Sequence, residues 1–130
     1  MKTELLYLVY VTALTGLLWV PYILDRIATG GLLDAVGYPE NSKPQSKWAT
    51  RLSKAHANAV ENLVVFAALV LAAGVAGVSN AAIAGAAVVY FWARLVHALA
   101  FTFAIPWART LAFVVGFGAQ AIIACQLLAR

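Results

Sequence analysis

The fold of this chain is decided by the stretch NLVVFAALVLAAGVAGV, Asn62 to Val78, which contains no charged side chain. The residues before it, from Trp48 onward, are polar but favour helix. Crossing about 30 Å of hydrocarbon takes roughly 20 helical residues. We therefore expect one transmembrane helix from Trp48 to Val78, with a polar first third and an apolar remainder.

Three other segments have the same apolar character and predict three more spans: Glu4–Ala28, Ala81–Ala104 and Trp107–Leu128. The first follows Met1 closely, so a secretion signal is the alternative. Its apolar run is long enough to span, however, and no small-residue cleavage pattern ends it, so we expect a retained helix. Pro21 is expected to kink this helix, because proline cannot donate a backbone hydrogen bond.

The composition supports the membrane assignment. Of the 130 residues, 64% are hydrophobic and 11% are charged, whereas a soluble domain has about 25% charged residues. The sequence thus predicts an all-α integral membrane protein, a four-transmembrane-helix bundle in the lipid bilayer that forms a single domain, 1–130. The net charge of +4 is assigned to membrane edges, and no nucleic-acid partner is expected. Cys125 is the only cysteine, so neither an intrachain disulfide nor a cysteine metal cluster is possible.

Basic residues predict the topology, because Lys and Arg concentrate in cytoplasmic loops. The long connection at 30–47 and the turn before the fourth helix carry most of them, with their flanks: Arg26, Lys43, Lys47, Arg51, Lys54 and Arg109. The other side carries only Lys2 and Arg130. We therefore expect both termini to lie outside the cytoplasm.

Several polar residues interrupt the predicted spans, and such residues are costly in lipid without a partner. At about 100° per residue, one face of the second helix carries Arg51, Lys54, Asn58, Glu61 and Asn62; Arg94 and His97 lie in the third helix and Arg109 begins the fourth. Glu61 and Arg94 should both lie about 15 Å deep at 1.5 Å per residue. We expect them to pair directly or through one bridging residue.

Two interpretations of these polar residues remain open. They could serve only to hold the bundle together, or they could line a polar pocket open to the cytoplasm. The set is larger than one ion pair needs and extends continuously from the surface inward, which favours the pocket. A metal site is not expected, since His56 and His97 have no third ligand at a useful spacing.

Three blocks of sequence resemble a known family. The stretch RLSKAHANAVEN from Arg51 to Asn62, followed by an apolar run, is similar to the second-helix signature of the MAPEG superfamily, the membrane-associated proteins in eicosanoid and glutathione metabolism. The stretch RLVHALAF, from Arg94 to Phe101, and the stretch PWART that follows it look like the next two blocks. The resemblance covers nearly the whole chain, and we identify the sequence as a bacterial-looking member.

The resemblance implies a homotrimer in the bacterial inner membrane, with glutathione bound near the cytoplasmic side between protomers. Carried over by position, the glutathione-binding residues would be Lys54, Asn58, Glu61, Arg94 and His97. Arg51 is added to them because it lies on the polar face of the second helix, at the cytoplasmic mouth of the expected pocket. Glu61 would meet the glutathione amine, and Arg109 would be the catalytic residue that stabilises the thiolate. The reaction implied is that of a glutathione-dependent transferase or peroxidase acting on a lipophilic electrophile.

The chain also departs from the enzymes of this family. Lys54 replaces the more usual arginine and so lacks a planar two-point grip on a carboxylate. Phe101 and Phe113 stand where the enzymes commonly have tyrosine, which removes two hydroxyl groups. Two alternatives therefore remain beside the enzyme: a non-catalytic small-ligand-binding protein, and a structural subunit of a membrane assembly.

Overall fold

A computed structural model describes residues 1–129 of the chain; Arg130, one of the two cations expected on the terminal side, lies outside the described residues. The elements in chain order are α1 (Thr3–Leu17), α2 (Trp19–Gly30), α3 (Leu32–Val36), α4 (Lys47–Ala76), α5 (Ala81–Thr102) and α6 (Ala108–Leu128). Four segments are long and apolar enough to span a membrane: Thr3–Gly30 and the helices α4, α5 and α6. The four predicted spans are confirmed, with ends that differ from the prediction by one or two residues.

The first span is bent rather than a single straight helix. It divides at Leu18 into α1 and α2, and the reason is Pro21, which has no N–H to donate to the carbonyl of Leu17 four residues earlier. The predicted kink is therefore confirmed. The long connection after α2 is less irregular than expected, since it contains the short helix α3.

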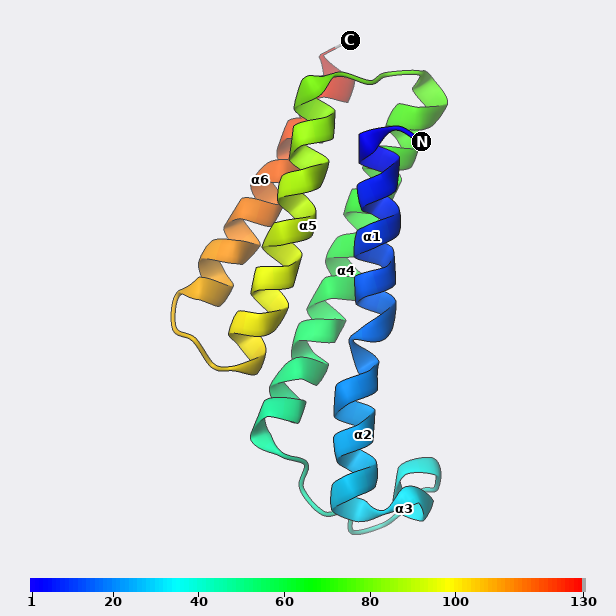
Figure 1. The fold of residues 1–130 in the computed structure, drawn as a ribbon, viewed down its shortest axis with the longest axis vertical. Coiled ribbons are helices and arrows are strands. Elements are labelled where there is room, and N and C mark those ends of the chain that lie inside the picture. Colours follow the sequence, from blue (N-terminus) through cyan, green and yellow to red (C-terminus); the bar gives the residue numbers. More distant parts are fainter. Residues whose placement is uncertain (130) are drawn as a thin grey trace.

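The four spans run antiparallel, so the two ends of the bundle differ in character. The N-terminus, the α4–α5 turn and the end of α6 lie at one end, while α3 and the α5–α6 turn lie toward the other (Figure 1). At that second end, α2 and the start of α4 extend beyond the α5–α6 turn (Figure 1). The basic connections thus share one end of the molecule, and we refer to it as the basic end.

Each of the helices α4 and α5 ends in the same hydrogen-bonded turn. At the end of α4, Val78 N–H donates to the carbonyl of Ala73, and Gly77 adopts φ +71°. At the end of α5, Ile105 N–H donates to the carbonyl of Ala100, and Ala104 adopts φ +55°. This left-handed position normally carries glycine, so α5 ends in a conformation that its alanine disfavours. This turn ends α5 at Thr102, two residues before the end at Ala104 that the sequence predicted.

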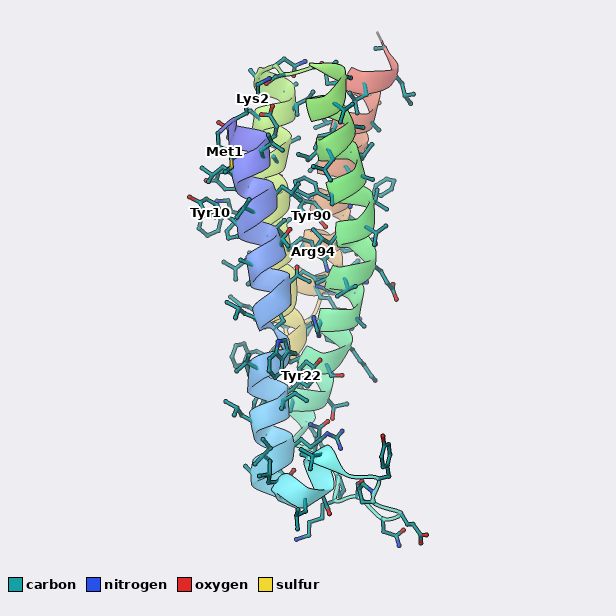
Figure 2. All side chains as sticks on the ribbon, turned by 90° about the vertical axis from the view of Figure 1, so that its right-hand side faces the viewer. Met1, Lys2, Tyr10, Tyr22, Tyr90 and Arg94 are labelled. Atoms are coloured by element: carbon teal, nitrogen blue, oxygen red, sulfur yellow. The ribbon has the colours of Figure 1, made fainter. Side chains whose placement is uncertain are left out.

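The core combines one large aromatic pair with many small residues. The rings of Phe66 on α4 and Tyr90 on α5 stack with centroids 3.9 Å apart, and both side chains are fully buried. Alanines such as Ala73 and Ala87 are buried around them, and small residues let helix backbones approach closely in lipid. Tyr90 and Arg94 lie inside the bundle, whereas Tyr10 points away from it (Figure 2).

A polar clasp, formed by Tyr22, Asp25, Gln45, Ser46 and His56, fixes α2 against the start of α4. The Asp25 carboxylate accepts hydrogen bonds from the Ser46 backbone N–H (3.1 Å) and hydroxyl (2.6 Å). The Tyr22 hydroxyl lies 2.8 Å from Nδ1 of His56, and Gln45 donates to the carbonyl of Tyr22 at 3.0 Å. The last residues of the long connection are therefore held against α2.

The opposite end of the bundle is closed by two further polar contacts. The Ser79 hydroxyl donates to Glu4 at 2.7 Å, which joins α1 to the α4–α5 turn. Asn80 caps α5 by accepting from Ile83 N–H, and its side-chain amide donates to Gln126 at 2.9 Å. Because Glu4 is buried, this contact orders the first turn of α1 inside the bundle.

Candidate functional site

A buried polar network lies between α4 and α5, toward the middle of the bundle. Arg94 is only 3% exposed and lies inside the molecule (Figure 2). Its Nη2 donates to Oδ1 of Asn58 at 2.7 Å and lies 3.4 Å from Nδ1 of His97. A buried arginine needs partners, and the network supplies a neutral amide and a ring nitrogen.

The network continues toward α6 through amide side chains. Asn62 donates to the backbone carbonyl of Asn58 at 2.9 Å, and Gln120 of α6 donates to the carbonyl of Asn62 at 3.0 Å. Gly116 of α6 lies beside this network, and a Cβ added there would meet Cδ of Arg94 at 3.8 Å, an ordinary van der Waals contact. The polar groups therefore tie three helices together.

Glu61 does not take part in this network, and the expected pairing with Arg94 is wrong for the single chain. Among the described residues, 1–129, Arg94 forms its short contact with Asn58, and Glu61 accepts no hydrogen bond. The reason is orientation: Asn58 faces Arg94 from α4, whereas Glu61 is exposed on the surface of α4. Equal depth was therefore insufficient to predict the pair.

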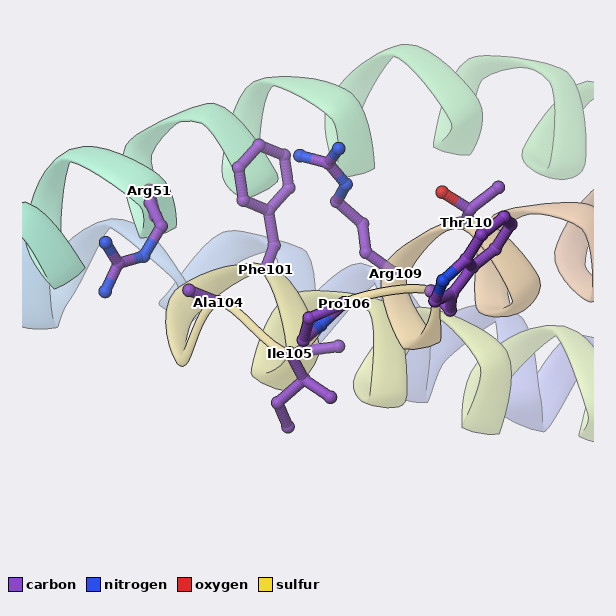
Figure 3. A pocket seen from close by; sticks show the side chains of 9 residues that line it. Arg51, Phe101, Ala104, Ile105, Pro106, Arg109 and Thr110 are labelled. Atoms are coloured by element: carbon purple, nitrogen blue, oxygen red, sulfur yellow. The ribbon is translucent and has the colours of Figure 1, made fainter.

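A small polar cleft opens at the basic end, between the start of α4 and the α5–α6 turn. Its volume is about 210 Å³, and its lining is Arg51, Ala100, Phe101, Ala104, Ile105, Pro106, Trp107, Arg109 and Thr110. Arg51 donates from Nε to the carbonyl of Thr102 at 2.9 Å, which caps the end of α5. The Arg109 and Phe101 side chains both point toward α4, whereas Ile105 points the other way (Figure 3). Two cations thus line a cleft with aromatic and aliphatic walls, one on each side of the Phe101 ring (Figure 3).

Aromatic rings connect the cleft to the buried network. The Arg109 guanidinium carbon lies 4.5 Å from the centroid of the Phe101 ring, a cation–π arrangement that holds the guanidinium over the ring face. The Phe101 ring in turn lies 5.9 Å from the His97 ring, and Phe113 lies 6.4 Å from it. One continuous set of contacts therefore extends from Arg109 at the surface to Arg94 in the interior.

The predicted site residues fall into three groups. Arg51 and Arg109 line the cleft; Asn58, Arg94 and His97 form the buried network; Lys54 and Glu61 are exposed on α4. The sequence suggested that all of these residues line one pocket, and in the single chain they do not. The three larger grooves on the surface, of about 470 to 540 Å³, are lined almost entirely by apolar side chains.

Sequence reasoning missed the contribution of the α5–α6 turn. The predicted helices left Ile105 and Pro106 as a short connection and began the fourth helix at Trp107, yet all three residues line one wall of the cleft. Their apolar character in a connecting turn was the available signal, since turns that face water are polar. From the sequence, Phe101 was considered only as a position that lacks the hydroxyl of tyrosine. The structure shows that its ring packs against the Arg109 guanidinium.

Comparison with known proteins identifies the architecture. Residues 6–129 match the MAPEG family. The chain belongs to this family. No curated protein and no solved structure matches it. MAPEG membership and the four apolar helices together establish an integral membrane protein. The cleft and the buried network are thus features of a MAPEG protein, and the resemblance of the three sequence blocks is confirmed at the level of the family.

Proposed function

We propose that this MAPEG protein binds glutathione at the basic end and presents its sulfur to a lipophilic electrophile dissolved in the bilayer. The observation that carries the proposal is that Arg51 and Arg109 line a single cleft. Lys54 and Glu61 lie exposed on the same helix as Arg51. Three cations and one acid suit a ligand that carries two carboxylates and one amine, as glutathione does.

The size of the cleft favours a site completed by a neighbouring protomer. Ligand pockets typically measure about 300–1,000 Å³, whereas this cleft measures about 210 Å³. Glu61 lies at the middle of α4, where lipid would leave a carboxylate without a partner. A homotrimer in which a second copy covers this face of α4 would enlarge the cleft and shield Glu61.

Each charged group has a distinct part in the proposed mechanism. Bound glutathione supplies the nucleophilic sulfur. Arg51 and Lys54 attract the carboxylates, and Glu61 accepts from the amine. Arg109, held over Phe101, places positive charge where it favours the deprotonated thiol, since a nearby cation lowers a thiol pKa. Holding the thiol and the electrophile together supplies much of the remaining rate enhancement.

A non-catalytic binding protein is the competing function, and a specific observation favours it. Phe101 and Phe113 line the region between Arg109 and His97, and neither can donate the hydrogen bond that a tyrosine would give. We therefore expect weak glutathione binding, in the millimolar to high micromolar range, which corresponds to about 4–6 kcal/mol.

The test is calorimetric titration of glutathione into the detergent-solubilised protein, with Arg109→Ala and the matched variant Lys43→Ala. Lys43 is an exposed cation in the connection at the basic end, so its removal controls for overall charge. We expect Arg109→Ala to weaken binding by about 1.5–3 kcal/mol, the contribution of a hydrogen bond to a charged group, and Lys43→Ala to leave it unchanged. Absence of binding to the unmodified protein would contradict the glutathione proposal.

Turnover of a model aryl halide with glutathione separates the enzyme from the binding protein. An enzyme should lose turnover with Arg109→Ala by more than the loss of binding explains. Binding without turnover in the unmodified protein would assign the non-catalytic function. A further pair, Phe101→Tyr and Phe113→Tyr, should strengthen binding if the missing hydroxyls are the cause of its weakness.

A further inference from the structure

The α5–α6 turn, residues 103–107, exposes an unusual amount of apolar surface at the basic end. Phe103 is 66% exposed, Ile105 50% and Trp107 79%. All three side chains are too apolar for a turn that projects into water. The same turn forms one wall of the cleft, so what covers its outer side decides where the cleft opens.

The lengths of the helices indicate what covers it. The helices α5 and α6 contain 22 and 21 residues, or about 33 and 32 Å at 1.5 Å per residue. These lengths match a hydrocarbon core of about 30 Å, so the turn that joins them lies at the boundary between hydrocarbon and headgroups. The start of α4 extends farther (Figure 1), and Lys47 and Arg51 begin it on the headgroup side.

The backbone of the turn is fixed in a way that presents these side chains outward. Ala104 and Trp107 have φ +55° and +68°, a left-handed conformation that side chains other than glycine rarely adopt. Ile105 N–H donates to Ala100 at 2.9 Å and Leu111 N–H donates to Trp107 at 2.8 Å, so the turn is hydrogen-bonded on both sides. The Ile105 side chain points away from the side that Phe101 and Arg109 face (Figure 3).

We propose that the α5–α6 turn is seated in the interfacial layer of the leaflet at the basic end, with Trp107 as its anchor. Indole rings concentrate at this layer, because one edge is apolar and the N–H finds a polar partner. Because residues of the turn line the cleft, the cleft opens at headgroup depth. One consequence rests on the proposed function: the lipophilic partner would reach Arg109 from the leaflet.

The test uses the depth of Trp107 in vesicles and needs no activity or ligand. A variant with Trp19→Phe, Trp48→Phe and Trp92→Phe keeps Trp107 as the only tryptophan. Its matched control keeps Trp92, an exposed residue near the middle of α5. We expect lipids brominated near the headgroup end of the acyl chain to cause the larger loss of Trp107 fluorescence, and lipids brominated near the methyl end the larger loss of Trp92 fluorescence.

Two outcomes would overturn the proposal. Quenching of Trp107 mainly by aqueous iodide would place the turn in water. Insensitivity to both brominated lipids and iodide would mean that protein, such as a second copy, covers it.

Should the tryptophan variants fail to fold, Ile105→Cys in a Cys125→Ala background carries a polarity-sensitive fluorophore instead. Its emission should lie to the blue of that from a Lys43→Cys label, and equal emission would contradict the interfacial position. A failure of glutathione binding would leave all of these readouts unaffected.

Discussion

Tyr90 illustrates how a buried side chain contributes through its ring and not its hydroxyl. The ring stacks on Phe66, while the hydroxyl has no hydrogen-bond partner among residues 1–129. A buried polar group without a partner costs about 1–3 kcal/mol. We expect Tyr90→Phe to leave the melting temperature in detergent unchanged or to raise it.

Tyr90→Leu is the matched variant, because it removes both the hydroxyl and the ring. It should lower stability, since an aromatic pair contributes about 0.5–1.5 kcal/mol beyond its buried area. A clear loss of stability in Tyr90→Phe would reveal a partner for the hydroxyl, such as an internal water.

Asn58 and Arg94 should be energetically coupled, because Arg94 donates to Asn58 at 2.7 Å. We expect the double variant Asn58→Leu/Arg94→Leu to be less destabilised than the sum of the single variants. Coupling between residues in contact is typically about 0.5–3 kcal/mol. Equilibrium unfolding in detergent measures all the variants of the cycle.

Glu61 provides the control for this cycle. Among residues 1–129 no hydrogen bond or ion pair joins it to Arg94, and its side chain is exposed, so Glu61→Leu and Arg94→Leu should be additive to within about 0.5 kcal/mol. If Asn58 and Arg94 were additive while Glu61 and Arg94 were coupled, the partner of Arg94 would be Glu61, as the sequence suggested.

At the scale of the element, the ends of α4 and α5 form a natural comparison. Both have a left-handed residue in the same type of turn, Gly77 in one and Ala104 in the other. A residue with a Cβ pays roughly 1–2 kcal/mol for this conformation. We expect Ala104→Gly to raise the melting temperature and Gly77→Ala to lower it.

The open surroundings of Gly77 mean that steric clashes do not affect this comparison. A Cβ added at Gly77 would meet no atom within 4 Å, so the substitution probes the backbone conformation alone. A fall in stability for Ala104→Gly would show that the alanine methyl group makes contacts that outweigh the strain.

At the scale of the whole molecule, the exposed Glu61 and the small cleft lead us to expect a homotrimer. Native mass spectrometry in mild detergent should give a mass three times the 13.8 kDa of the chain. Glu61→Arg should reduce the trimer, because a second copy would have to bury an added cation at mid-bilayer depth. Lys43→Glu, in the exposed connection, is the control. Monomers alone in the unmodified protein would contradict the expectation.

The orientation in the membrane is a second expectation at this scale. The cations cluster at the end that carries α3 and the α5–α6 turn, and this end should face the cytoplasm. A reporter that is active only in the cytoplasm should be inactive when fused to either terminus. The same reporter inserted after Glu40 should be active. The reverse pattern would show that the termini face the cytoplasm.

The sequence by itself determined the number of spans, their order and the kink at Pro21. These features depend on local properties: apolar length against bilayer thickness, and the missing donor of proline. The sequence also identified Asn58, Arg94 and His97, which form the buried network, because each is conspicuous in an apolar segment.

Only the tertiary structure decided which of those residues meet. The choice between Asn58 and Glu61 as the partner of Arg94 depends on the rotation of α4 against α5, and three residues along a helix change the direction of a side chain by about 60°. The cleft likewise depends on how far α4 extends past the α5–α6 turn, which brings Arg51 to the carbonyl of Thr102. Helix rotation and offset are set by packing against neighbouring helices, and no periodicity within a single helix records them.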